Sequence, residues 1–111
     1  MLRCYKEVKM LEKPVEQKLC KEVEKRGGKA FKLECPGADG MPDRLVVLPG
    51  GKIYFIETKR PKGGRFRKLQ KYRISQLQEL GCDARKIKSY EEVEAFIKEV
   101  TEEEKSDLQS A

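Results

Sequence analysis

The sequence predicts a small α/β domain whose elements run in the order helix, three strands, helix, strand, helix. Two observations predict this class. Segments with apolar residues at three- and four-residue spacing alternate with short apolar runs typical of strands, and clusters of glycine and proline separate them. The chain has 111 residues, of which 38% are hydrophobic and 40% charged. These values fit one domain with a modest core. We place it at residues 1–101 and expect the acidic stretch 102–111 to be a disordered tail.

The first predicted element is an amphipathic helix over residues 8–23, which ends before a pair of glycines. Pro14 is expected in its first turn or at a bend. Glu16 lies at the edge of the apolar stripe. A carboxylate there is either a boundary residue that reaches water or one that points inward at a cation. The apolar positions are Val8, Leu11, Val15, Leu19 and Val23.

The three strands of the first half follow this helix. Residues 29–33 alternate in polarity and predict a short strand, whereas residues 35–42 are rich in glycine and proline and predict a loop. The apolar runs 44–48 and 52–56 flank a Pro-Gly-Gly sequence at positions 49–51. Two apolar runs joined by three such residues predict a β-hairpin.

The register of this hairpin brings two acids together. If Leu48 pairs with Lys52, counting outward pairs Asp43 with Glu57, and Lys59 stays on the same face if the strand continues. Opposed like charges destabilise a sheet by up to about 1 kcal/mol. A divalent cation held by both carboxylates would offset this repulsion, and Mg²⁺ or Mn²⁺ prefers such hard oxygen ligands. The alternative is a solvated acidic end with Lys59 as an ordinary ion-pair partner, and a bulge would change the register.

The second half of the chain predicts a helix, a strand and a closing helix. Residues 66–80 have a helical apolar pattern in which Tyr72 is expected to be a core residue, and Gly81 is placed to end the helix. Residues 84–87 predict a short strand. Ser89 to Glu92 has the form of a capping box, which begins a closing helix with apolar residues as far as Val100.

The basic residues are concentrated in one segment. Net charge is +6, and residues 59–73 contain eight lysines or arginines and no acid. Such a segment is typical of a surface that binds phosphates by charge without reading bases. The alternative is a helix face that is basic only for solubility. The candidate DNA contacts are Lys62, Arg65, Arg67, Lys68, Lys71 and Arg73, with Lys32 on the preceding strand.

The remaining composition excludes several classes. There are four widely spaced cysteines and no histidine, so a zinc site is not expected. The first residues carry charge throughout and lack a continuous apolar core, so a signal peptide is not expected, and no stretch approaches the roughly 20 apolar residues that a membrane-spanning helix needs. We therefore expect a reduced, cytoplasmic protein without a membrane partner.

The pattern Gly40-Met41-Pro42-Asp43, a hairpin, Glu57-Thr58-Lys59 and then Gln70 before Gly81 resembles the VRR-NUC family, the virus-type replication-repair nucleases. These belong to the PD-(D/E)xK superfamily, whose restriction-endonuclease-like αβββαβ core has a mixed central sheet flanked by helices. The similarity covers residues 16 to 90. It implies a Mg²⁺- or Mn²⁺-dependent endonuclease in which Asp43, Glu57 and the backbone carbonyl of Thr58 hold the metal. Glu16 matches an acid that acts through a metal-bound water.

The resemblance also implies roles for two further residues. Lys59 would orient or help to deprotonate the attacking water and stabilise charge on the phosphate, and Gln70 would face the same pocket. The implied substrate is branched DNA, and the implied assembly is a homodimer suited to cutting a Holliday junction on two strands. The resemblance also implies a bacterial or phage-infected cell as the setting. The alternatives are a flap or nicking nuclease of viral replication and repair, and a catalytically silent DNA-binding module.

Overall fold

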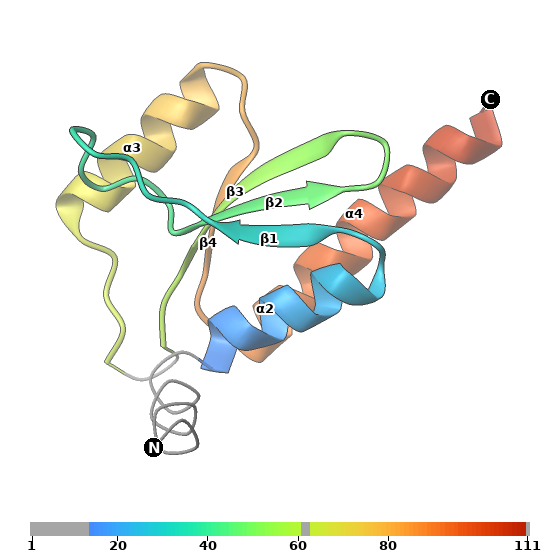
Figure 1. Ribbon diagram of the computed structural model, residues 1–111, viewed down its shortest axis with the longest axis horizontal. Helices are drawn as coiled ribbons and strands as arrows, with labels where there is room; N and C mark the ends of the chain where they lie inside the picture. The colour runs from blue at the N-terminus through green and yellow to red at the C-terminus, as the bar shows by residue number, and fades with distance from the viewer. Residues whose placement is uncertain (1–13, 61–62, 111) are drawn as a thin grey trace.

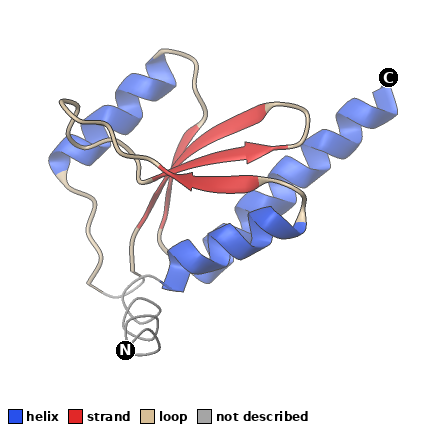
Figure 2. Cartoon of the chain, viewed as in Figure 1, coloured by secondary structure: helices blue, strands red, loops and turns tan. Residues whose placement is uncertain are grey.

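The computed structural model describes residues 14–60 and 63–110, which form one four-stranded sheet and three helices (Figure 1, Figure 2). The predicted order of elements is confirmed. The part of the first helix predicted over residues 8–13 lies outside the described residues. The elements are α2 (Pro14–Lys25), β1 (Lys29–Lys32), β2 (Arg44–Leu48), β3 (Lys52–Thr58), α3 (Lys68–Glu79), β4 (Ala84–Ile87) and α4 (Tyr90–Ser110).

The sheet has the strand order β1-β2-β3-β4. Strand β2 pairs antiparallel with both β1 and β3, whereas β3 and β4 are parallel, so the sheet is mixed as predicted. The hairpin register is confirmed as well. Leu48 lies opposite Lys52 and Arg44 opposite Ile56, which makes Asp43 and Glu57 the next opposed positions.

One face of the sheet carries the hydrophobic core. The even-numbered apolar side chains of the hairpin are buried against α2 and α4, and two of them, Val46 and Ile56, are completely buried. These two helices run side by side on that face (Figure 1). Burial of one such aliphatic side chain contributes about 1.5–3 kcal/mol. The helices contribute Val15, Leu19, Val23, Val93, Phe96, Ile97 and Val100 to this core.

The other face is covered only in part. Helix α3 lies on that side next to β4 (Figure 1), and Ile74 is its buried residue. The prediction of a core position for Tyr72 is wrong, because its side chain is 57% exposed. A helix that covers a single edge of the sheet buries a narrow stripe, which leaves Leu69 and Leu80 exposed too. Away from α3, Phe31 and Ile53 are about half exposed on the same face of the sheet.

The closing helix begins as the capping box predicts. The Glu92 N–H donates to the Ser89 hydroxyl at 3.1 Å, and the Glu92 carboxylate accepts the Lys88 N–H at 3.0 Å. Helix α4 continues to Ser110, through the stretch for which the sequence predicts a disordered tail. The domain boundary near residue 101 stays a prediction. None of the described helices has the length and apolar character of a membrane-spanning segment.

Candidate active site

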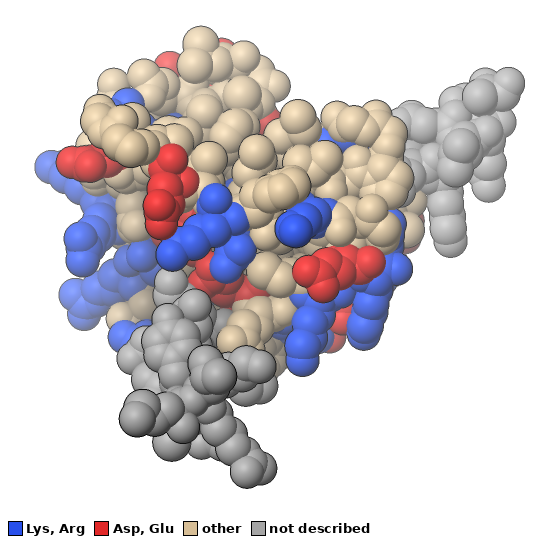
Figure 3. All heavy atoms as spheres, in the orientation of Figure 1, with Lys and Arg blue, Asp and Glu red and all other residues tan. Residues whose placement is uncertain are grey.

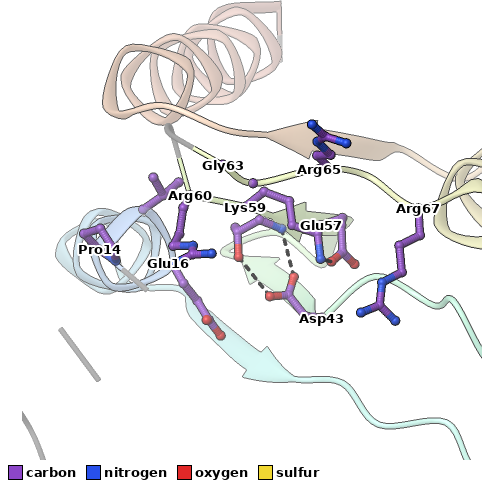
Figure 4. Close-up of a pocket in the computed structure, with 12 residues that line it drawn as sticks. Pro14, Glu16, Asp43, Glu57, Lys59, Arg60, Gly63, Arg65 and Arg67 are labelled. Carbon is purple, nitrogen blue, oxygen red and sulfur yellow. Dashed lines mark hydrogen bonds and ion pairs between the residues drawn. The ribbon is translucent and has the colours of Figure 1, made fainter. Parts of the chain in front are cut away.

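A pocket of about 610 Å³ lies at the end of the hairpin strands, between the first turn of α2 and the segment that leads into α3 (Figure 4). Both opposed acids and Lys59 line it. The hairpin register predicted from the sequence thus brings the two acids to one pocket. The full lining is Pro14, Val15, Glu16, Asp43, Glu57, Thr58, Lys59, Arg60, Gly63, Gly64, Arg65 and Arg67.

Asp43 is fixed by the strand opposite to it. One carboxylate oxygen accepts the Thr58 backbone N–H at 3.0 Å, and the other accepts the Thr58 hydroxyl at 2.8 Å. The Asp43 carbonyl also accepts the Leu33 N–H at 2.9 Å, which ties its backbone to the end of β1. Thr58 thus has a side-chain role that the sequence reasoning, which considered only its carbonyl, did not find.

Glu57 is buried, with 3% of its surface exposed. Its Oε1 lies 3.1 Å from the Gln70 side-chain amide nitrogen and 3.4 Å from Lys59 Nζ. Its Oε2 is buried without a hydrogen-bond donor among the described residues. One carboxylate oxygen of the pair is therefore available to a ligand, at a position shielded from bulk water.

Burial raises the pKa of both acids. The pKa of Glu57 rises to about 7, first because burial penalises its charge and second because Asp43 is close, while Lys59 opposes both effects. Burial also raises the pKa of Asp43, against the two hydrogen bonds from Thr58. A pair of carboxylates that is costly to ionise is stabilised by a bound cation.

Gln70 connects the first turn of α3 to this pair. Its side-chain oxygen accepts the Arg67 backbone N–H at 2.8 Å, so its amide nitrogen is the atom that faces Glu57. The loop before Asp43 is attached to the same helix. Gly40 packs so closely on Leu69 that a Cβ there would lie 2.7 Å from the leucine Cγ, and its φ of +83° favours glycine.

Glu16 reaches the pocket from α2, where it is 4% exposed. Its Oε1 lies 2.6 Å from both Nε and Nη2 of Arg44, whose Nη1 donates to the Ala30 carbonyl at 3.1 Å. Among the described residues no three acids or cysteines converge as a metal cluster. Arg44 was not foreseen. Alternation along β2 places it on the helix-covered face with Val46, where an arginine needs a carboxylate partner.

The predicted DNA contacts are only partly gathered at the pocket. Arg65 and Arg67 line it, and Lys and Arg side chains cluster at this end of the molecule (Figure 3). Arg73 instead donates to the Asp39 carbonyl and to Gln76, and Lys32 lies 3.5 Å from Glu34. Lys68 and Lys71 are exposed on α3. Lys62 lies outside the described residues. Arg60 lines the pocket but was missed, although it belongs to the same basic segment.

The chain is therefore a small α/β protein with a mixed sheet and an acid-acid-lysine pocket at the end of its central hairpin. A solved structure titled "VRR_NUC domain" superposes with a TM-score of 0.72 and 28% sequence identity, over 77% of this chain and 91% of that one. The fold is that of a VRR-NUC domain. The resemblance to this family is thereby confirmed.

Sequence comparison gives one further relative. Over 50 residues the chain is 54% identical to "Putative nuclease p44" of Acyrthosiphon pisum secondary endosymbiont phage 1. This match covers 45% of the chain and 54% of that protein, so the chain spans about half the length of the curated relative. No protein-family model matches the chain.

Proposed function

We propose that this domain is a divalent-metal-dependent DNA endonuclease that hydrolyses phosphodiester bonds. The observation that carries the proposal is the pairing of Asp43 with a buried Glu57, with Lys59 3.4 Å from the latter, in a pocket lined by arginines. Phosphodiester hydrolysis requires an activated water and neutralisation of the charge that grows on the phosphate. The names of the two similar proteins, a nuclease and a VRR-NUC domain, support the same reaction class.

The donor set of the pocket fits a magnesium or manganese ion. Asp43 and Glu57 offer hard carboxylate oxygens, and Oε2 of Glu57 is buried with no hydrogen-bond donor among the described residues. We assign the backbone carbonyl of Thr58 as a third ligand. When bound, such an ion supplies a Lewis acid for the phosphate and a water of lowered pKa.

The other residues of the pocket act on water and phosphate. Lys59 orients or helps to deprotonate the attacking water and stabilises charge on the phosphate. Gln70 holds Glu57 in place through its amide nitrogen, at 3.1 Å. Glu16 reaches the site through a water molecule while Arg44 anchors its carboxylate, at 2.6 Å.

The substrate class follows from the charge around this pocket. Arg65, Arg67, Lys68 and Lys71 contact phosphates, which gives binding without base specificity. From the resemblance to the VRR-NUC family we propose, in addition, branched DNA as the preferred substrate and a homodimer as the active form. Two active sites related by a two-fold axis would cut opposite strands of a four-way junction.

A cleavage assay tests the activity. The chain is incubated with four-way junction, flap and linear duplex DNA in Mg²⁺, Mn²⁺ or EDTA, in parallel with Asp43→Asn. The matched control is Asp39→Asn, which removes the same charge from an exposed residue of the preceding loop. We expect cutting only with metal, best on the junction, lost in Asp43→Asn and retained in the control. Tight DNA binding without cutting would favour the silent binding module instead.

The relative cleavage of the same substrates distinguishes the nuclease subclasses. Preferential cutting of the flap or of one strand of the linear duplex would point to a flap or nicking enzyme. Sedimentation velocity tests the homodimer, and a species that stays monomeric in the presence of junction DNA would contradict paired incision.

A further inference from the structure

The arginines of the chain fall into two groups by their contacts. Outside the pocket, every described arginine has a protein acceptor for its guanidinium. Arg26 pairs with Glu22, Arg44 with Glu16, Arg73 with the Asp39 carbonyl, and Arg85 with Asp83 and Glu99. The three that line the pocket, Arg60, Arg65 and Arg67, make no side-chain hydrogen bond or ion pair with any residue in the described ranges.

This difference is not explained by a shortage of acids. The two carboxylates of the same pocket are close by, but they are engaged by other donors. Asp43 accepts hydrogen bonds from the N–H and the hydroxyl of Thr58. Glu57 accepts a hydrogen bond from Gln70 and forms an ion pair with Lys59. A guanidinium is a planar fork of donors that matches the oxygens of a phosphate in two-point contact. Guanidinium groups that line a pocket without a protein acceptor therefore point to a phosphate ligand.

Two of these arginines lie on opposite sides of the acid pair. In Figure 4, Arg60 extends beside Glu16 on the α2 side, and Arg67 extends on the far side of Asp43, at the start of α3. Gly64 lies against the backbone of Arg60, where an added Cβ would be 2.7 Å from the Arg60 nitrogen and closer still to its carbonyl oxygen. Because Gly64 has no side chain, it can pack on the end of β3, and Arg65 and Arg67 follow it in the sequence.

We infer that one DNA strand crosses the acid pair between Arg60 and Arg67, and that each guanidinium binds one phosphate that flanks the bond to be cut. This inference rests on the proposed nuclease function and adds to it a path for the strand. It also has a consequence for the substrate. A strand whose phosphates are bound on both sides of the acid pair is cut at internal bonds. A terminal bond that lacks one flanking phosphate is a poor substrate.

The first test measures DNA binding in EDTA, where no cutting occurs. Arg60→Ala and Arg67→Ala are compared with Arg26→Ala, which removes the same charge near the other end of α2, roughly 15 Å along the helix from Glu16. Each pocket variant should bind about 10-fold more weakly at fixed salt, and the slope of log affinity against log salt should fall by about 0.9 for each phosphate that is no longer neutralised. The control should match the wild type. Equal affinities for Arg60→Ala and Arg26→Ala would overturn the inference.

The second test locates the two phosphates. A series of otherwise identical four-way junctions, in which the branch point fixes where the chain binds, carries a single neutral methylphosphonate at successive positions of one strand. Two positions should weaken binding by the wild-type chain, one of them without further effect in Arg60→Ala and the other without further effect in Arg67→Ala. Reductions that multiply at every position would contradict the assignment of one phosphate to each arginine.

The two proposals fail separately. If metal-dependent cutting occurs but Arg60→Ala behaves like Arg26→Ala, the nuclease stands and the flanking contacts do not. If the binding results hold but no metal supports cutting, the pocket is a backbone-binding site and the nuclease proposal fails alone.

Discussion

The two faces of the β2–β3 hairpin are built from the same strands but have different roles. Val46 and Ile56 point to one face and are completely buried under α2 and α4. The other face begins with partly exposed apolar residues such as Ile53 and ends at Asp43 and Glu57. The first face stabilises the fold, whereas the second concentrates charge in a pocket at the end of the strands.

Burial has opposite consequences at the two places. At Ile56 it contributes free energy of folding through the hydrophobic effect. At Glu57 it raises the pKa to about 7, so ionisation at neutral pH opposes folding. The comparison teaches that the core supplies the stability that offsets the cost of the acid pair, and that a bound cation would lower that cost.

The largest expected effect is on activity at the pocket. If the proposed function holds, Glu57→Gln should lower metal-dependent cleavage by about 10³-fold or more, because loss of a proposed metal ligand removes several kcal/mol of transition-state stabilisation. The same variant should be more stable than the wild type in EDTA at pH 8. Exposed Glu79→Gln is the matched control. Wild-type cleavage by Glu57→Gln would contradict the assignment of this acid.

The next effect is on stability at the opposite face. Ile56→Ala should lower the free energy of unfolding by about 2–5 kcal/mol, because it leaves a cavity in the core. Ile53→Ala makes the same chemical change three residues away, where the side chain is 52% exposed, and should cost less than about 1 kcal/mol. Chemical denaturation measures both. Equal destabilisation would show that the two faces do not differ in packing.

A smaller effect on stability is expected at the Glu16–Arg44 pair, which lies next to the pocket. Arg44→Met should destabilise the chain by about 2–3 kcal/mol, because it leaves Glu16 as a buried charge without this partner. Adding Glu16→Gln to Arg44→Met should restore part of that stability. If the two substitutions are additive in thermal unfolding, the 2.6 Å contact does not couple them.

The smallest expected effect is on the pH dependence of unfolding. Glu57 has a folded pKa of about 7 against an ordinary value of 4.5. Its stabilising contribution is therefore fully present below pH 4.5 and is lost as the pH rises through 7. In EDTA the midpoint of unfolding should be higher at pH 5.5 than at pH 8, by an amount equivalent to about 1–2 kcal/mol once screening by solvent is allowed for. The difference should shrink in Glu57→Gln. A midpoint that rises with pH would contradict the raised pKa.

The sequence predicted the hairpin and its acids well because the physics there is local. A three-residue connection and alternating apolar residues set the register, and the register alone places Asp43 opposite Glu57. The closing helix was predictable for a similar reason, since Ser89 and Glu92 act within one turn of each other.

The parts that could not be predicted depend on how distant elements pack. Tyr72 looked like a core residue because its spacing is helical, but only the placement of α3 at one edge of the sheet decides that it is exposed. The Glu16–Arg44 pair joins residues that are 28 positions apart. Arg60 belongs to a run of basic residues, and no local pattern distinguishes it from its neighbours. Only the folded pocket places it beside the acids.

The central claim is that Asp43 and Glu57 together hold a divalent cation. The most direct measurement is Mn²⁺ binding to the full chain at pH 8, followed by electron paramagnetic resonance of the free ion, for the wild type, Asp43→Asn and Glu57→Gln. The account predicts saturable binding to the wild type that is lost in both variants and retained in Asp39→Asn. Wild-type affinity in both acid variants would contradict it.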